Sequence, residues 1–471
     1  MLRNSVLSLL VFLACHATGC CKDTDAPARR QVLNLAGVAG NGPPTKPRAA
    51  KAQASESTTV VASAPPLRFP RGFFSQAAAI IPLGAGAGHT AQGVVFANGS
   101  DWSPQPLVMY EVGLEPEAFN TKPQWISEKS GYYSGVCTGD LGGKGGHDLA
   151  VTALRDGYGD FQGVDKDRVS RVEIYLGTGS DNRREAFDKT PIRLDGTSPA
   201  SSCAIADVDG DGVSEILVGG LGPRGAAQLF HRKSVNDKFE ARDFGEPCAN
   251  TEAPFQPGEV AIEDVNDDGR PDLLLAGKRL AVYYAGLSGT QKERFSSTAS
   301  WCSEEELGYS PSVQVAHVTD PKRTLVTVSR SCVDLREPCP PGGWLVYNPA
   351  ASTTRLWERD APVGTVAGPA VLTSLPSATG DDVPDLLVSM LYDPKQPQCF
   401  GAAMQLYPGR AHAPHEPAEF GTPWHPDYEP VASKLLPVNL YRKKCADLLV
   451  VSAHPATPPA LFVEAGPCAT E

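Results

Sequence analysis

The feature that most constrains the fold is a short apolar run that recurs seven times along the chain. Each run is followed by a second apolar stretch that ends in an aromatic residue. The runs are Gly93–Phe96, Asp148–Thr152, Ile216–Val218, Asp272–Ala276, Thr324–Val328, Asp385–Ser389 and Asp447–Val451. The aromatic residues are Tyr110, Tyr175, Phe230, Tyr283, Tyr347, Tyr407 and Phe462, spaced 53 to 65 residues apart. Seven units of about 60 residues therefore fill the chain from roughly residue 70 onward.

Further strands are expected on either side of these two runs. Ser202–Ala206 and Ser312–Ala316 precede their runs, and Pro191–Leu194 follows an aromatic strand. Four short antiparallel strands per unit, repeated seven times, predict an all-β fold, a seven-bladed β-propeller of four-stranded blades. Abundant Pro and Gly (42 and 46 residues) favour short elements joined by turns. A solenoid or a chain of separate sandwiches is the alternative.

The last unit ends soon after its third strand. The chain stops at Glu471, so a fourth strand for this unit has to come from elsewhere. We expect a segment near Leu67–Phe69 to supply it and to close the ring.

An acidic loop lies directly before the third of these runs. Asp207, Asp209 and Asp211 stand at loop positions 1, 3 and 5, Gly212 permits a sharp turn, and Glu215 follows at position 9. Four carboxylates and the carbonyl of Val213 offer the oxygen ligands that calcium prefers. Strand-forming residues follow where an EF-hand needs a helix. An acidic surface turn without metal is the alternative.

The stretches 207–220 and 264–277 resemble FG-GAP repeats, the units of the integrin α-subunit propeller and of many bacterial surface proteins. The resemblance implies a seven-bladed propeller with calcium in loops between the first two strands of certain blades. Carried over by position, it implies a second calcium site with the ligands Asp264, Asn266, Asp268, the Arg270 carbonyl and Asp272. Structural calcium at about two sites is therefore expected.

Other units carry loops that are poorer in acids. In 140–148, Gly142 and Lys144 stand where oxygen ligands are needed, so the Lys144 ammonium could take the place of the ion. Lys443 occupies the corresponding position in the last unit, where its ammonium could likewise take the place of the ion. The unit ending at Asp385 offers only Ser377, Thr379 and Asp381, which predicts weak calcium binding or none.

The N-terminus predicts export. Residues 1–19 combine Arg3, an apolar run and small residues, as in a secretory signal peptide. Ala17-Thr-Gly19 before Cys20 resembles a bacterial lipobox, which implies lipidation of Cys20 and attachment to the outer membrane or cell surface. A secreted or periplasmic protein is the alternative. Residues 20–66 predict a disordered linker, and 67–471 the propeller.

Charge and cysteine content narrow the function. A formal net charge of −12 argues against nucleic acid as a partner. Twelve cysteines suit an oxidising compartment. Candidate pairs are Cys137 with Cys203, Cys248 with Cys302 and Cys332 with Cys339, although spacing alone does not decide the connectivity.

The sequence contains no motif that indicates an enzyme. We therefore expect a non-catalytic module for protein binding, scaffolding or adhesion, with an unknown protein or glycan partner docking on the inserts 155–171 and 332–343. A carbohydrate-binding or polysaccharide-degrading propeller is the alternative. Trp125, Trp301, Trp357 and Trp424 recur at similar places in their units, which indicates packing, whereas Trp102 and Trp344 are the better candidates for exposure.

Overall fold

The structure is a computed structural model, and every element that it describes is a β-strand. The described residues all lie within Val60–Glu471. They are 67–69, 75–83, 91–100, 103–112, 121–143, 147–153, 170–179, 186–197, 200–220, 227–245, 247–248, 258–286, 294–307, 311–319, 322–330, 343–351, 355–360, 371–375, 385–391, 402–407, 432–438, 447–452 and 459–462. The signal peptide, Cys20 and the linker lie outside these residues, so those expectations stay predictions.

The described strands form seven antiparallel sheets, which we number along the chain. Sheet 1 contains β2 (Ser75–Leu83), β3 (Ala91–Ser100), β4 (Ser103–Val112) and β5 (Trp125–Gly131). Sheet 2 contains β6 (Tyr133–Gly139), β7 (Asp148–Ala153), β8 (Ser170–Tyr175) and β9 (Ile192–Thr197). Sheet 3 contains β10 (Ala200–Ala206), β11 (Glu215–Gly220), β12 (Gln228–His231) and β13 (Glu240–Asp243).

The next three sheets repeat this order. Sheet 4 contains β14 (Glu259–Glu263), β15 (Asp272–Ala276), β16 (Leu280–Tyr283) and β17 (Trp301–Cys302). Sheet 5 contains β18 (Val313–Thr319), β19 (Lys322–Arg330), β20 (Gly343–Tyr347) and β21 (Trp357–Asp360). Sheet 6 has three described strands, β22 (Val371–Leu375), β23 (Asp385–Leu391) and β24 (Ala402–Tyr407).

Sheet 7 joins the two ends of the folded chain. It contains β25 (Ala432–Val438), β26 (Asp447–Ser452), β27 (Ala460–Phe462) and, as its fourth strand, β1 (Leu67–Arg68). β1 pairs antiparallel with β27, with Leu67 opposite Leu461 and Arg68 opposite Ala460. The predicted closure of the last unit by an N-terminal segment is therefore confirmed.

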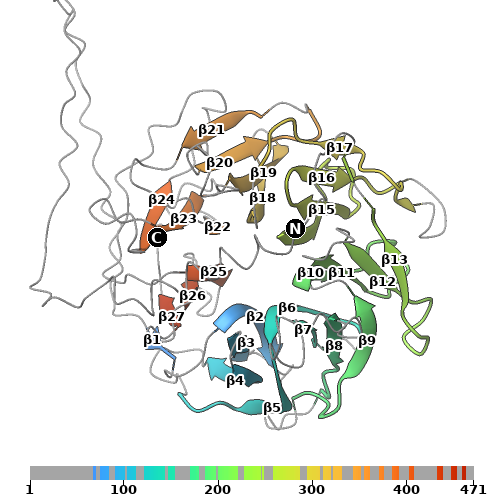
Figure 1. The fold of residues 1–471 in the computed structure, drawn as a ribbon, viewed down its shortest axis with the longest axis vertical. Coiled ribbons are helices and arrows are strands. Elements are labelled where there is room, and N and C mark those ends of the chain that lie inside the picture. The colour runs from blue at the N-terminus through green and yellow to red at the C-terminus, as the bar shows by residue number, and fades with distance from the viewer. Residues whose placement is uncertain are drawn as a thin grey trace, which may run out of the picture. The chain divides into compact units, whose positions relative to one another are not determined.

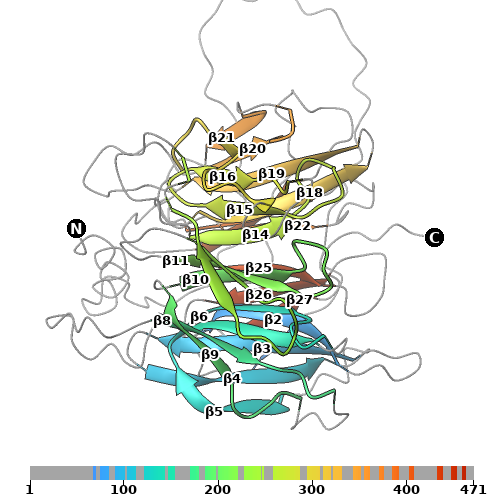
Figure 2. The ribbon, with the colours of Figure 1, turned by 90° about the vertical axis from the view of Figure 1, so that its right-hand side faces the viewer.

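The sheets are arranged in a ring (Figure 1). The first strand of each sheet contacts the first strands of two neighbouring sheets, and the series β2, β6, β10, β14, β18, β22 and β25 returns to β2. Turned by 90°, the ring is seen from its side, with β5 at the bottom and β21 at the top (Figure 2). The prediction of an all-β propeller is thus confirmed, with seven sheets among the described residues.

The hydrophobic core lies between neighbouring sheets. Separate buried clusters join sheets 1 and 2, 2 and 3, 3 and 4, 4 and 5, and 7 and 1. Five of the predicted aromatic residues, those whose side chains are described, are buried in these clusters: Tyr110, Tyr175, Phe230, Tyr283 and Tyr347. The repeat in the sequence therefore records positions that face a neighbouring sheet.

Tryptophan burial follows the prediction in part. Trp125 and Trp301 are buried, as expected for packing between sheets. Trp344 is also fully buried in β20, so its expected exposure was wrong. Nearly all of β20 is buried, because a sheet in a ring has a neighbour on either side. Trp102 and Trp424 lie outside the described residues, and the Trp357 side chain is not described.

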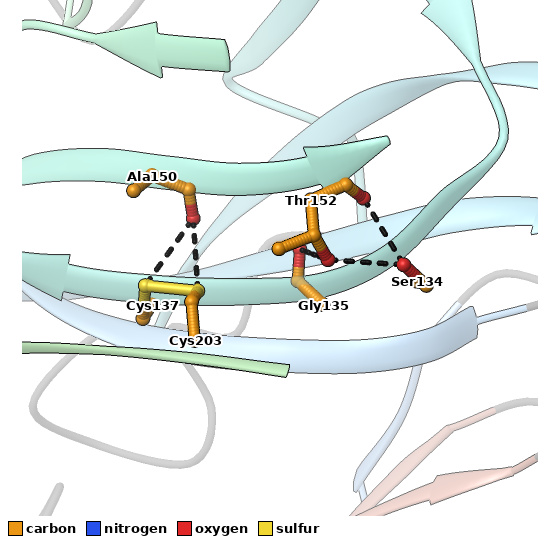
Figure 3. Close-up of a disulfide and its surroundings, with 6 residues drawn as sticks. All are labelled: Ser134, Gly135, Cys137, Ala150, Thr152 and Cys203. Atoms are coloured by element: carbon orange, nitrogen blue, oxygen red, sulfur yellow. Dashed lines mark hydrogen bonds between the residues drawn. A yellow bond between two sulfur atoms is a disulfide. The ribbon is translucent and has the colours of Figure 1, made fainter. Parts of the chain in front are cut away.

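Two disulfides tie neighbouring sheets together. Cys137 of β6 is bonded to Cys203 of β10, and Cys248 is bonded to Cys302 of β17. Both sulfur atoms of the first bridge lie 3.5 Å from the carbonyl oxygen of Ala150 on β7 (Figure 3). These two predicted pairs are confirmed, whereas Cys332 and Cys339 lie outside the described residues.

An ion pair also connects sheets that are not neighbours. The Lys434 ammonium of β25 contacts the Glu259 carboxylate of β14, so sheet 7 is linked to sheet 4. The other oxygen of Glu259 accepts hydrogen bonds from Ser312 Oγ and Val313 N, both at 2.8 Å. One carboxylate therefore ties together the first strands of sheets 4 and 7 and the start of sheet 5.

Candidate metal centre

Three equivalent turns connect the first and second strands of sheets 2, 3 and 4. We call them the Gly-rich loop (140–148), the first acidic loop (207–215) and the second acidic loop (264–272). Their fourth residues, Gly143, Gly210 and Asp267, all have a positive φ, of 63°, 75° and 60°. The three loops therefore share a left-handed residue at position 4 although their side chains differ, and residues 144–146 of the Gly-rich loop lie outside the described residues.

Each loop ends on a buried carboxylate at position 9. Asp148 is 2% exposed, and Glu215 and Asp272 are fully buried. Each accepts a hydrogen bond from the backbone N–H at position 2: Leu141 at 2.6 Å, Val208 at 2.8 Å and Val265 at 3.1 Å. This bond closes the loop onto the second strand whether or not the rest of the loop is acidic.

The first acidic loop brings three of its predicted ligands together. One carboxylate oxygen from each of Asp207, Asp209 and Glu215 lies within 4.8 Å of the other two. Asp207 also accepts from Gly210 N at 2.7 Å and Gly212 N at 2.8 Å, and Asp211 accepts from Val213 N at 2.8 Å. These bonds fix the loop around a cluster of oxygen atoms that suits a hard cation.

The electrostatics of the first acidic loop favour a bound cation. Burial, together with the charges of Asp209, Asp211 and Asp207, raises the pKa of Glu215 to about 8, although the hydrogen bond from Val208 N opposes this. Burial and the charges of Asp209 and Asp207 also raise the pKa of Asp211, although the hydrogen bond from Val213 N opposes this. Mutual repulsion of this kind is relieved by a cation among the oxygen atoms.

The second acidic loop has the same backbone bonds. Asp264 accepts from Gly269 N at 2.7 Å and from Asp268 N at 3.1 Å, and Asn266 Oδ1 accepts from Asp268 N at 3.0 Å. Burial raises the pKa of Asp272 to about 6, although bonds from Ala285 N and Val265 N oppose this. The cluster of three carboxylate oxygens in the first acidic loop nevertheless has no counterpart among residues 264–272, all of which the structure describes.

The charge of Asp268 is already balanced by Arg270. The Arg270 guanidinium forms an ion pair with Asp268 Oδ2. Burial raises the pKa of Asp268, but hydrogen bonds from the side chain and backbone of Arg270 outweigh this, so the pKa lies below its ordinary value. The first acidic loop has Val213 at the matching position and no positive residue among 207–215.

The Gly-rich loop contains only two acids, Asp140 and Asp148, and its buried Asp148 is satisfied by backbone groups. Asp148 accepts from Leu141 N, Gly142 N and Gly177 N at 2.5–2.6 Å, so both of its oxygens are satisfied by the backbone. The turn after β12 packs on this loop so closely that a Cβ at Gly143 would lie 2.6 Å from Val235 Cγ1. Lys144, predicted to replace the ion, lies outside the described residues.

A buried arginine faces the Gly-rich loop from sheet 3. Arg232 is 4% exposed, donates to Val235 O at 2.6 Å and lies over the Phe239 ring at 4.6 Å. Burial lowers its pKa, while the charge of Asp148 and then that of Asp237 raise it. Arg232 is thus a positive group beside the buried Asp148.

Another arginine contacts the first acidic loop from sheet 4. Arg294 donates to the backbone carbonyl of Asp209. Like Arg232, it lies in the connection between the third and fourth strands of the following sheet. Sequence reasoning missed both arginines, because only the packing of one sheet on the next brings them to these loops.

A group of polar side chains around His317 lies next to the second acidic loop. His317 Nδ1 lies 2.9 Å from Thr324 Oγ1, and His317 Nε2 lies 3.8 Å from Glu263 Oε2. Thr324 is 1% exposed and donates to Asp267 at 3.3 Å, so its hydroxyl is not accessible to a substrate. The cluster supports the loop and does not form a nucleophilic site.

Two further predicted positions fall outside the described residues. These are the loop of Ser377, Thr379 and Asp381, and Lys443 of the last unit. No helix in the described part of the chain is long and apolar enough to cross a membrane.

Comparisons with known proteins give a similarity of fold only. No family model and no curated protein matches the chain. A structure of BBS1N in complex with ARL6DN, soaked with lead, is 13% identical, with a TM-score of 0.45, over 84% of this chain and 96% of that chain. The Dos1 propeller is 9% identical, with a TM-score of 0.44, over 78% and 75%. The periplasmic gluconolactonase PpgL of Pseudomonas aeruginosa is 12% identical, with a TM-score of 0.44, over 79% and 97%.

Proposed function

We propose that this chain is an exported, lipid-anchored β-propeller that binds structural calcium and acts as a non-catalytic binding scaffold. The observation that carries the calcium part is the convergence of Asp207, Asp209 and Glu215, whose oxygens lie within 4.8 Å of one another. The donor set consists of carboxylates and carbonyls, which calcium prefers over softer ligands. Calcium there would offset charges that the fold brings close together.

Two sites are proposed. The first would use Asp207, Asp209, Asp211, Glu215 and the Val213 carbonyl, and the second Asp264, Asn266, Asp268, Asp272 and the Arg270 carbonyl. Calorimetric titration of the chelated protein with calcium is expected to reveal about two sites. Heat changes that persist in a variant combining Asp209→Ala and Asp268→Ala would contradict this assignment.

The family proposal rests on the same loops. Both acidic loops resemble FG-GAP repeats in residue order, and each connects the first and second strands of its sheet, as that resemblance implies. We therefore propose an integrin α-like propeller of the FG-GAP type.

The anchor is proposed from the sequence alone. Residues 1–19 would direct export, and acylated Cys20 would hold the protein at the outer membrane or cell surface through the linker 20–66. In a bacterial host, labelled fatty acid should be incorporated into the wild type and not into Cys20→Ala. Equal labelling of both would refute lipidation at Cys20.

The scaffold part is supported by the shape of the fold. Three carboxylate-closed loops lie at one edge of sheets 2, 3 and 4, and their polar groups engage the protein itself, so the repeated loops serve structure. Binding to a partner is assigned to the predicted inserts 155–171 and 332–343, of which residues 155–169 and 332–342 lie outside the described residues, while Ser170, Arg171 and Gly343 belong to β8 and β20. Replacing residues 333–342 by a Gly/Ser linker of equal length should abolish capture of an envelope partner without changing the melting temperature.

A carbohydrate-active propeller remains the competing function. Tight binding to one glycan class on an array, with calcium present, would favour a lectin. Cleavage of any member of a polysaccharide panel would overturn the non-catalytic assignment. If the chain neither binds a glycan on the array nor cleaves a polysaccharide, the proposed protein partner is favoured.

A further inference from the structure

The two acidic loops differ in charge at position 7. Position 7 is Val213 in the first loop and Arg270 in the second, and in both loops only the backbone carbonyl of this residue is a proposed calcium ligand. The first loop contains four carboxylates and no cationic residue of its own, although Arg294 of sheet 4 donates to its Asp209 carbonyl, whereas the second contains four carboxylates and Arg270. The side chain at position 7 is not a proposed ligand in either loop, whereas the ligand sets also differ at position 3, which is Asp209 in the first loop and Asn266 in the second.

Arg270 engages both oxygens of one proposed ligand. Its backbone N–H donates to Asp268 Oδ1 at 3.0 Å, and its guanidinium pairs with Asp268 Oδ2. Both side chains are about three-quarters buried, at 25% and 27% exposure, so the pair is partly shielded from water. In the first loop, Asp211 receives the matching backbone bond from Val213, whose side chain has no charge to offer.

The Arg270 backbone is held independently of its side chain. Pro271 follows it, and a residue before proline is restricted to extended conformations. The loop also keeps its turn through Gly269, whose φ is 82°, and through the bonds to Asp264. A change of side chain at position 270 therefore leaves the carbonyl of that residue where it is.

We propose that the Arg270 guanidinium is a built-in competitor for calcium at the second acidic loop. It neutralises Asp268 when the ion is absent and has to release that carboxylate when the ion binds. The second loop consequently binds calcium more weakly than the first, and the two loops fill in sequence as calcium rises. This inference rests on the proposed calcium sites and adds the order in which they load.

The test measures one loop at a time by calorimetry with calcium chloride. In an Asp209→Ala background, which disables the first loop, Arg270→Val should tighten binding at the second loop about three- to tenfold. In an Asp268→Ala background, the reciprocal Val213→Arg should weaken the first loop by a similar factor. Lys278→Val is the matched control, because Lys278 lies outside the loop and pairs with Glu306 instead.

A second measurement separates competition from a loss of folding. Arg270→Val should be slightly less stable than wild type in chelator, because Asp268 loses its partner, yet show a larger rise in melting temperature on calcium addition. If Arg270→Val left the calcium dissociation constant of the second acidic loop unchanged, or changed it only as much as Lys278→Val does, the proposal that Arg270 competes with calcium would be wrong. Absence of calcium binding in the wild type would overturn the calcium sites themselves, and this outcome is distinct from the first.

Discussion

The Gly-rich loop and the first acidic loop share two structural features but differ in how the charge of their buried acid is balanced. Both have a left-handed residue at position 4 and a buried carboxylate at position 9 that accepts from position 2. In the Gly-rich loop, that carboxylate is satisfied by three backbone donors and lies beside Arg232. In the first acidic loop, it lies among other carboxylates. The left-handed residue and the buried acid therefore hold the loop in place in both cases, and of the two only the first acidic loop has several further carboxylates that could bind calcium.

We expect the largest difference in stability between the two loops when the buried acid at position 9 is replaced by its amide. Asp148→Asn replaces an acceptor of three backbone hydrogen bonds by an amide, which should cost about 2–4 kcal/mol of unfolding free energy. The loss should be the same with calcium and with chelator. Glu215→Gln should destabilise the protein only when calcium is present. Denaturant unfolding of both variants in both buffers checks this, and a calcium-dependent loss in Asp148→Asn would erase the distinction.

The role of Arg232 gives the next largest effect. Arg232→Met keeps the apolar length of the side chain but removes its charge and its bond to Val235, and should cost about 1–3 kcal/mol. Because the charge belongs to the protein, chelator should not change this cost. The conservative Arg232→Lys should recover part of the stability. A variant as stable as the wild type would show that the Gly-rich loop needs no cation at all.

The sequence predicted some features of this fold, whereas several side-chain contacts between sheets could not be predicted from it. The repeat predicted the sheets and the Cys137–Cys203 bridge, because both depend on residues at matching places in successive units. The closure by β1 was predicted from the missing fourth strand of the last unit, and Cys248–Cys302 was predicted as a bridge across a long loop. The burial of Trp344, the Glu259–Lys434 pair and the positions of Arg232 and Arg294 depend on how one sheet lies against another. Spacing along the chain carries no information on such contacts. The acidic residues of the loops were predictable, whereas the pairing of Arg270 with Asp268 was not.

The smallest expected effect is a pH dependence of the chelated protein. The pKa of Glu215 in the folded state, about 8, lies above its ordinary value of 4.5. Its contribution is therefore fully present below pH 4.5 and is lost as the pH rises through 8. Chelated wild type should lose about 1 kcal/mol of stability between pH 6 and 7 relative to Glu215→Gln. Parallel pH profiles of the two proteins would show that Glu215 ionises normally.

Thermal unfolding with and without calcium tests the central claim most directly. Chelation should lower the melting temperature of the wild type by several degrees. The variant combining Asp209→Ala and Asp268→Ala should already melt at the lower temperature and should not respond to calcium. A wild type that is indifferent to chelation, or a double variant that responds to calcium as the wild type does, would contradict the proposal that these loops hold structural calcium.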